Sequence, residues 1–148
     1  MAGLLTTLAG VWLAQVGTRR FQAPLAIAFE DQATADVYQL LDTPAFEGKQ
    51  VLFGPSHQFT GTWLFRHRVV FRPLPPRLPA PDFLGWIQQK GIDYILADKH
   101  MIQRRRDTVR EYLAYDSAEG VKLVRAEPGW EVLYQGPPPS KFILLRVR

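Results

Sequence analysis

The sequence contains no cysteine, which excludes disulfide bonds, thiolate metal sites and cysteine nucleophiles. It also lacks the glycine-rich phosphate-binding patterns GxGxxG and Walker A, and the nucleophile-elbow pattern GxSxG. The three histidines, His57, His67 and His100, have no metal-ligand spacing and no HExxH motif around them. We therefore expect no catalytic residue of a familiar type, no metal site and no cofactor.

The composition of the chain is that of an ordinary globular domain. Of its 148 residues, 47% are hydrophobic, which argues against disorder. A chain of this length buries roughly 68–70% of its unfolded surface on folding, so it needs no covalent cross-links. Its net charge of +4 comes from arginine more than from lysine.

The amino-terminal segment is apolar. Residues 2–16 carry no charge, and Arg19 and Arg20 follow shortly after. A membrane-spanning helix needs about 20 apolar residues, so this segment is slightly short, and it lacks the basic start of a secretory signal. It fits a membrane helix truncated at its front, a short single anchor, or a helix buried in a soluble core. We expect residues 1–20 to form a membrane-anchor-like helix and residues 21–148 to form a soluble domain.

The rest of the chain alternates helix and strand patterns. The predicted elements are a helix at 31–41, strands at 49–53, 63–65 and 69–71, a helix at 83–90, a strand at 92–97, a helix at 100–113, and strands at 121–125, 130–134 and 142–147. Alternating helices and strands favour parallel pairing, and short connections between the last strands favour antiparallel pairing. We therefore expect an α/β fold: a mixed sheet with helices on its faces, antiparallel C-terminal strands, and the hydrophobic helix in front.

Capping and breaking residues mark the helix boundaries. Asp31 and Asp82 precede the first two predicted helices and are suitable N-caps, while Gly91 follows the second and is a suitable stop. The proline-rich segment 74–81 predicts an extended linker on the surface, because proline lacks the backbone donor that a sheet requires.

The ends of two predicted strands carry the candidate ligand-binding residues. Ser56 and His57 follow the strand at 49–53, and Asp98 ends the strand at 92–97. Ligands bind beyond the carboxyl ends of parallel strands in α/β folds. A simpler interpretation of Asp98 is the N-cap of the next helix, and a simpler interpretation of Ser56 and His57 is an exposed turn.

A run of three arginines, Arg104, Arg105 and Arg106, lies in the predicted helix 100–113. Such a run is suited to phosphate, including anionic lipid headgroups. Asp107 and Glu111 are interleaved with it, which also fits a solvated helix face.

Two longer segments, KGIDYILADKHMIQRRR and GWEVLYQGPPPSKFILLRVR, resemble the soluble carboxy-terminal domain of bacterial polytopic glycosyltransferases. These membrane enzymes are related to protein mannosyltransferases and to the aminoarabinose transferases of lipid A. The matching positions are 91–96, 130–134 and 142–147. The family's catalytic acidic residues lie in loops between early membrane helices and have no counterpart here, so the resemblance assigns no functional residue.

The resemblance implies a non-catalytic, extracytoplasmic domain, whether fragment or descendant, of a membrane glycosyltransferase that uses lipid-linked sugar donors. By the positive-inside rule, however, Arg19 and Arg20 would place the domain in the cytoplasm. The expected partners are membrane lipid and an integral membrane protein or the remainder of a polytopic enzyme, and no nucleic acid. The alternatives are a single-anchor accessory subunit of a membrane complex and a soluble enzyme with a site at Asp98, Ser56 and His57.

Overall fold

The computed structural model describes residues 31–53 and 65–148. The predicted hydrophobic helix, Ser56, His57 and most of the predicted strand 63–65 lie outside these ranges. Phe65, the described residue of that predicted strand, is not part of a strand. None of the helices in the described ranges combines the length and apolar character that crossing a bilayer requires.

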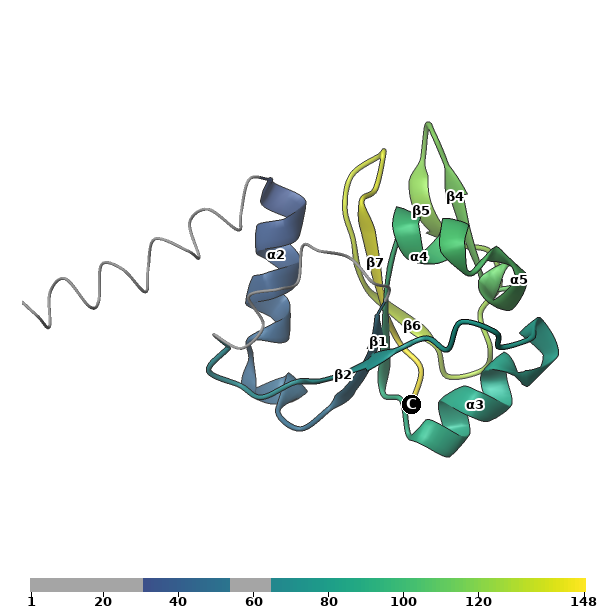
Figure 1. Ribbon diagram of the computed structural model, residues 1–148. Coiled ribbons are helices and arrows are strands. Elements are labelled where there is room, and N and C mark those ends of the chain that lie inside the picture. Colours follow the sequence, from purple (N-terminus) through teal and green to yellow (C-terminus); the bar gives the residue numbers. More distant parts are fainter. Residues whose placement is uncertain (1–30, 54–64) are drawn as a thin grey trace, which may run out of the picture.

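The core of the fold is a five-stranded mixed sheet with the strand order β2-β1-β3-β7-β6 (Figure 1). The strands are β1 (Gln50–Phe53), β2 (Val70–Pro73), β3 (Tyr94–Asp98), β6 (Glu131–Gln135) and β7 (Phe142–Arg146). Strands β2, β1 and β3 are parallel, whereas β7 is antiparallel to β3 and β6 is antiparallel to β7. The predicted mixed α/β sheet with antiparallel C-terminal strands is confirmed.

The two central strands are apolar on both faces, which explains their continuous hydrophobic sequences. In β3, Ile95 and Ala97 pack on one face of the sheet and Leu96 packs on the other. In β7, Ile143 and Leu145 alternate in the same way with Phe142 and Leu144. A strand that is covered on both faces requires apolar residues at successive positions rather than at alternate ones.

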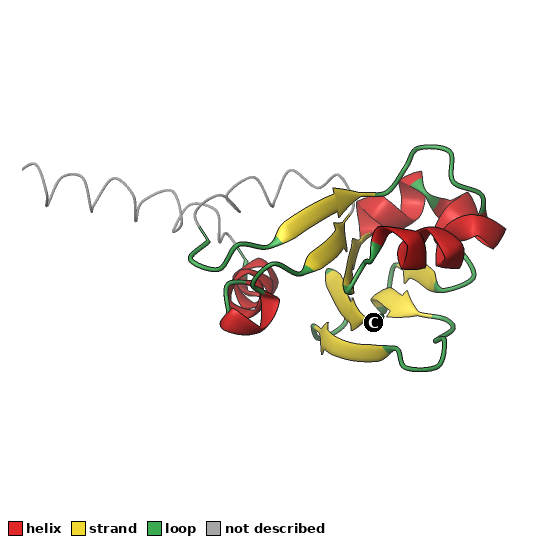
Figure 2. Cartoon of the chain, turned by 90° about the horizontal axis from the view of Figure 1, so that it is seen from below, coloured by secondary structure: helices red, strands yellow, loops and turns green. Residues whose placement is uncertain are grey.

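Helices cover both faces of the sheet (Figures 1 and 2). Helix α2 (Gln32–Leu41) packs on one face, and it is followed by the 3₁₀ turn η1 (Pro44–Phe46). The opposite face is covered by the 3₁₀ turn η4 (Ala80–Asp82) and the helices α3 (Phe83–Lys90), α4 (Lys99–Arg104) and α5 (Arg106–Val109). The sheet therefore separates two apolar clusters, one under each layer of helices.

The predicted caps are confirmed at two of three positions. The carboxylate of Asp31 accepts a 2.8 Å hydrogen bond from the Thr34 amide, and Gly91 ends α3 in the left-handed conformation. The side chain of Asp82, by contrast, makes no capping hydrogen bond, so that prediction is wrong. A capping residue needs an extended backbone, as Asp31 has, whereas Asp82 is the last residue of the turn η4, with φ −88° and ψ −9°.

The predicted helix 100–113 is wrong in extent. It breaks at Arg105, where φ −123° and ψ 27° leave the helical region, and Leu113 begins a strand. This strand, β4 (Leu113–Asp116), pairs with β5 (Gly120–Leu123) in a second, antiparallel sheet. Strand β5 was expected beside β6, but it pairs with β4 instead. The pairing of β4 with β5 supplies backbone hydrogen bonds between segments, and helix propensity, which is a local property, does not predict them.

The proline-rich segment is only partly the surface linker that the sequence predicts. Pro76, Pro79 and Pro81 are exposed, whereas Leu74 and Ala80 are buried against the sheet. The segment therefore follows the surface with its prolines while its small and apolar side chains hold it to the core.

Candidate functional site

The carboxyl ends of the parallel strands β1, β2 and β3 lie at one edge of the sheet, and Asp98 is the last residue of β3. Its side chain is only 6% exposed, and Oδ1 accepts a 2.7 Å hydrogen bond from the Met101 amide. Asp98 is thus the N-cap of α4, the simpler of the two interpretations that the sequence allowed. Ser56 and His57 lie outside the described residues, so their grouping with Asp98 stays a prediction.

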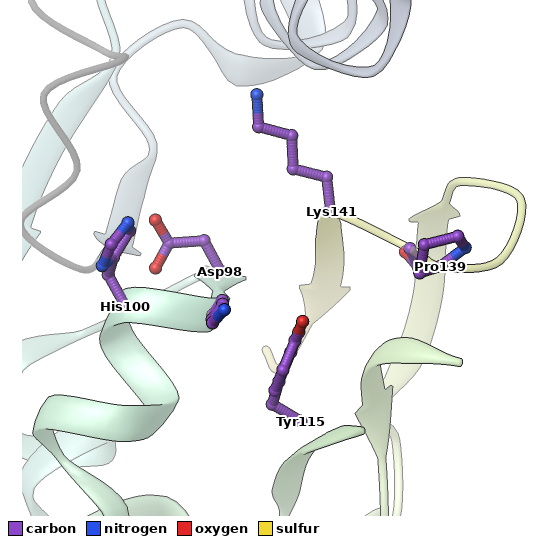
Figure 3. Close-up of a pocket in the computed structure, with 7 residues that line it drawn as sticks. Asp98, His100, Tyr115, Pro139 and Lys141 are labelled. Atoms are coloured by element: carbon purple, nitrogen blue, oxygen red, sulfur yellow. The ribbon is translucent and has the colours of Figure 1, made fainter. Parts of the chain in front are cut away.

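Asp98 borders a cavity of about 340 Å³, which we call the edge cavity (Figure 3). Its lining residues are Asp98, Lys99, His100, Tyr115, Pro139, Ser140 and Lys141. Figure 3 shows that Asp98, Tyr115 and Lys141 reach this space from different elements. Sequence analysis had placed only Asp98 here, because Tyr115 and Lys141 come from segments distant in the chain.

The amine of Lys141 points away from Tyr115 (Figure 3) and forms an ion pair with Asp31, the N-cap of α2. It also donates to the Thr34 hydroxyl at 3.2 Å. Partial burial raises the pKa of Asp31, but hydrogen bonds from Lys141 and Thr34 and the charge of Lys141 outweigh it, so the pKa lies below its ordinary value. Lys141 therefore joins α2 to the start of β7 across 110 positions of sequence.

The polar groups of the edge cavity are mostly engaged in holding the structure together. The Ser140 hydroxyl donates to the Phe142 carbonyl at 2.7 Å, and the Lys99 amine lies 4.9 Å from the centre of the Tyr115 ring. In the described ranges we find no hydrogen-bonded pair of nucleophile and base at this cavity. Over the same ranges, no three histidine, aspartate or glutamate side chains gather as metal ligands.

The predicted run Arg104–Arg106 is divided between two cavities, because the helix breaks at Arg105. Arg104 and Arg105 line a cavity of about 320 Å³, which we call the arginine cavity, together with Arg77 of the proline-rich segment. Arg106 lines a different cavity of about 390 Å³ with Arg110. Sequence analysis did not single out Arg77 or Arg110 as site residues. No sequence pattern predicts that Arg77 lines the same cavity as Arg104 and Arg105.

These five arginines form no ion pair with any carboxylate of the described residues. The ion pairs present there join other residues, and neither Asp107 nor Glu111 takes part in one. Asp107 and Glu111 are exposed, so the interpretation of a solvated helix face stays open beside that of a phosphate contact. The arginine charge on this side of the molecule is left to solvent or to a ligand.

Arg105 differs from its neighbours because part of its guanidinium group is buried. Its Nε is shielded from solvent and has no hydrogen-bond partner in the described part of the chain, while Nη1 donates to the Arg104 carbonyl at 3.3 Å. A buried donor without a partner costs about 1–3 kcal/mol, and more for a charged group. Arg105, which lines the arginine cavity, thus carries an unsatisfied donor, and the cavity is lined by three arginines against one carboxylate, Asp107.

Comparisons with protein-family models, with curated proteins and with solved structures give no match for this chain. The fold defines an α/β domain with one edge cavity whose polar groups cap and join elements, and with an arginine-lined surface on α4 and α5.

Proposed function

We propose that this chain is a non-catalytic domain, fragment or descendant, of a membrane glycosyltransferase that uses lipid-linked sugar donors. On this view the active site lies elsewhere in a polytopic enzyme. The domain stands on the extracytoplasmic side, beside the acceptor, and its arginines face membrane lipid. The proposal rests on the sequence resemblance given above together with one structural observation.

That observation is the placement of the three segments that carry the resemblance. Positions 91–96 include the first part of β3, positions 142–147 contain β7, and positions 130–134 include most of β6. In the sheet these strands are consecutive neighbours, in the order β3-β7-β6. The segments that carry the resemblance therefore lie in one continuous part of the sheet, which supports treating them together in the proposal.

A second candidate function is the accessory subunit of a membrane complex, and the outer strand of the sheet is compatible with it. Strand β6 is at the edge of the sheet, and the Val132 side chain on it is 42% exposed. An edge strand offers unpaired backbone groups to a partner chain. This observation fits a protein neighbour of either kind, so the identity of the neighbour distinguishes the two candidates.

The distinguishing experiment is extraction of native membranes with mild detergent, capture with an antibody against residues 65–148, and mass analysis of the captured material. The glycosyltransferase proposal expects this sequence within, or bound to, a polytopic protein that transfers sugar. A complex of other integral proteins without such a transferase would favour the accessory subunit. Recovery of a free monomer from the soluble fraction would contradict both.

A further inference from the structure

We propose that the arginine cavity is a binding site for a phosphate group, held by Arg77, Arg104 and Arg105. This inference does not depend on the glycosyltransferase proposal, because it stands on the geometry and charge of these side chains alone. The phosphate can belong to a lipid headgroup or to a soluble phosphate compound, and the experiment below separates the two sources.

The arginine cavity has an excess of positive charge. Three guanidinium groups from two separate segments line one cavity of about 320 Å³, and Asp107 is the single carboxylate among its lining residues. None of the three arginines forms an ion pair with a described carboxylate. Three positive charges against one carboxylate leave the cavity with an excess of positive charge, so an anion that enters it is attracted.

Arg105 carries a hydrogen-bond donor that no described residue satisfies. Arg105 Nε is buried and lacks a hydrogen-bond partner among the described residues. A guanidinium group presents its donors as a planar fork that matches two oxygens of a phosphate. A phosphate oxygen in the arginine cavity would supply the kind of acceptor that Arg105 lacks.

A hydrogen bond and core packing hold the backbone of the cavity wall in place. The Thr108 hydroxyl, on a side chain only 3% exposed, donates to the Leu78 carbonyl at 2.5 Å. This bond ties the proline-rich segment, which carries Arg77, to helix α5. Val109, the next residue of that helix, is fully buried in the core. Backbone that is held in place before binding loses less conformational freedom when a ligand arrives.

The neighbouring cavity supplies a matched comparison. It is lined by Arg106 and Arg110, both exposed, and it contains no buried unsatisfied guanidinium donor. Arg77 and Arg104 are likewise exposed. The double variants Arg77→Gln/Arg104→Gln and Arg106→Gln/Arg110→Gln therefore remove the same charge from exposed positions.

The experiment measures binding of the full chain to two probes: inorganic pyrophosphate by calorimetry, and phosphatidylcholine vesicles with or without phosphatidylglycerol by sedimentation. We expect R77Q/R104Q to weaken binding about tenfold, and R106Q/R110Q to change it by less than about twofold. If R77Q/R104Q weakens binding to the vesicles alone, the phosphate belongs to a lipid headgroup. If it weakens binding to pyrophosphate as well, the site takes a soluble phosphate. Thermal unfolding of each variant verifies that it is folded.

Two results would overturn the proposal. Equal loss in both double variants would mean that binding follows net charge rather than the arginine cavity. Failure of the unmodified chain to bind either probe would mean that the cavity holds no phosphate. The variant Arg105→Lys adds a charge-conserving check: we expect weaker binding, because lysine keeps the charge and loses the planar fork, and unchanged binding would remove Arg105 from the site.

Discussion

At the scale of single residues, two aspartates, Asp31 and Asp98, cap helices in different surroundings. Asp31 and Asp98 both have an extended backbone, and each accepts a hydrogen bond from the amide three residues later. Asp31 also pairs with Lys141, whereas Asp98 is buried beside the edge cavity. The two residues thus allow capping, ion pairing and ligand chemistry to be tested separately.

The Asp31 variants separate capping from pH dependence. Because the folded pKa of Asp31 is lowered, its charge contributes stability that is complete above the unfolded pKa of about 3.9 and is lost as the pH falls through the folded pKa. Asp31→Asn keeps a capping oxygen and loses the ion pair. Since Asp31 is 42% exposed, we expect a loss of at most about 1 kcal/mol at neutral pH, which shrinks below about pH 4.

Urea unfolding between acid and neutral pH measures this difference against the unmodified chain. Asp31→Ala is the companion variant and should lose about 1 kcal/mol more than Asp31→Asn, because alanine has no capping oxygen. A constant difference across the whole pH range would refute the role assigned to the ion pair.

The Asp98 variants address the soluble-enzyme alternative. Asp98→Ala should cost about 1 kcal/mol in unfolding free energy, since the Met101 amide loses its acceptor. Asp98→Asn should recover most of that loss, because asparagine is also a good N-cap. If Asp98→Ala leaves stability unchanged and abolishes a measurable activity, Asp98 is a functional residue rather than a cap.

At the scale of elements, one bridge joins the small β4–β5 sheet to the main sheet. Gly120 pairs with Ser140, and the Val121 amide donates to the Ser140 carbonyl at 2.8 Å. A Cβ at Gly120 would lie 2.1 Å from the Ser140 carbonyl oxygen, and Gly120 also has φ +83°. The approach of these two backbones thus requires glycine at this position.

Gly120→Ala and Gly129→Ala form a matched pair that tests the bridge. Gly129 has a similar φ of +87° but has no atom within 4 Å of its added Cβ. We expect about 1–2 kcal/mol of destabilisation at Gly129 from backbone strain alone. Gly120→Ala should lose a further 1–3 kcal/mol or so, because the main chain must move. Equal losses in chemical denaturation would show that the bridge adds nothing.

The elements that the sequence predicts correctly are those whose boundaries are set by residues within the same segment. Helix α2 and the end of α3 were predictable because Asp31 and Gly91 act within their own segments. The break at Arg105 was not predictable, and the segment around it takes part in contacts that no local pattern indicates, the pairing of β4 with β5 and the Thr108–Leu78 hydrogen bond.

At the scale of the whole molecule, the edge cavity and the arginine cavity are each assembled from segments far apart in the chain. The edge cavity joins the end of β3 to the start of β7, and the arginine cavity joins the proline-rich segment to α4 and α5. Sequence reasoning found Asp98 and the arginine run, but not Lys141 or Arg77, since no spacing rule links such distant positions. The mixed sheet itself was predictable, because continuous apolar strands require cover on both faces.

The central claim is that this domain contributes to sugar transfer without performing it. The most direct measurement is transfer of sugar from polyprenyl-phosphate donors, made in parallel on the purified chain and on the material captured from native membranes with it. We expect no turnover by the chain alone and clear turnover by the captured material. Turnover by the purified chain, or an inactive capture from membranes that retain the activity, would contradict the claim.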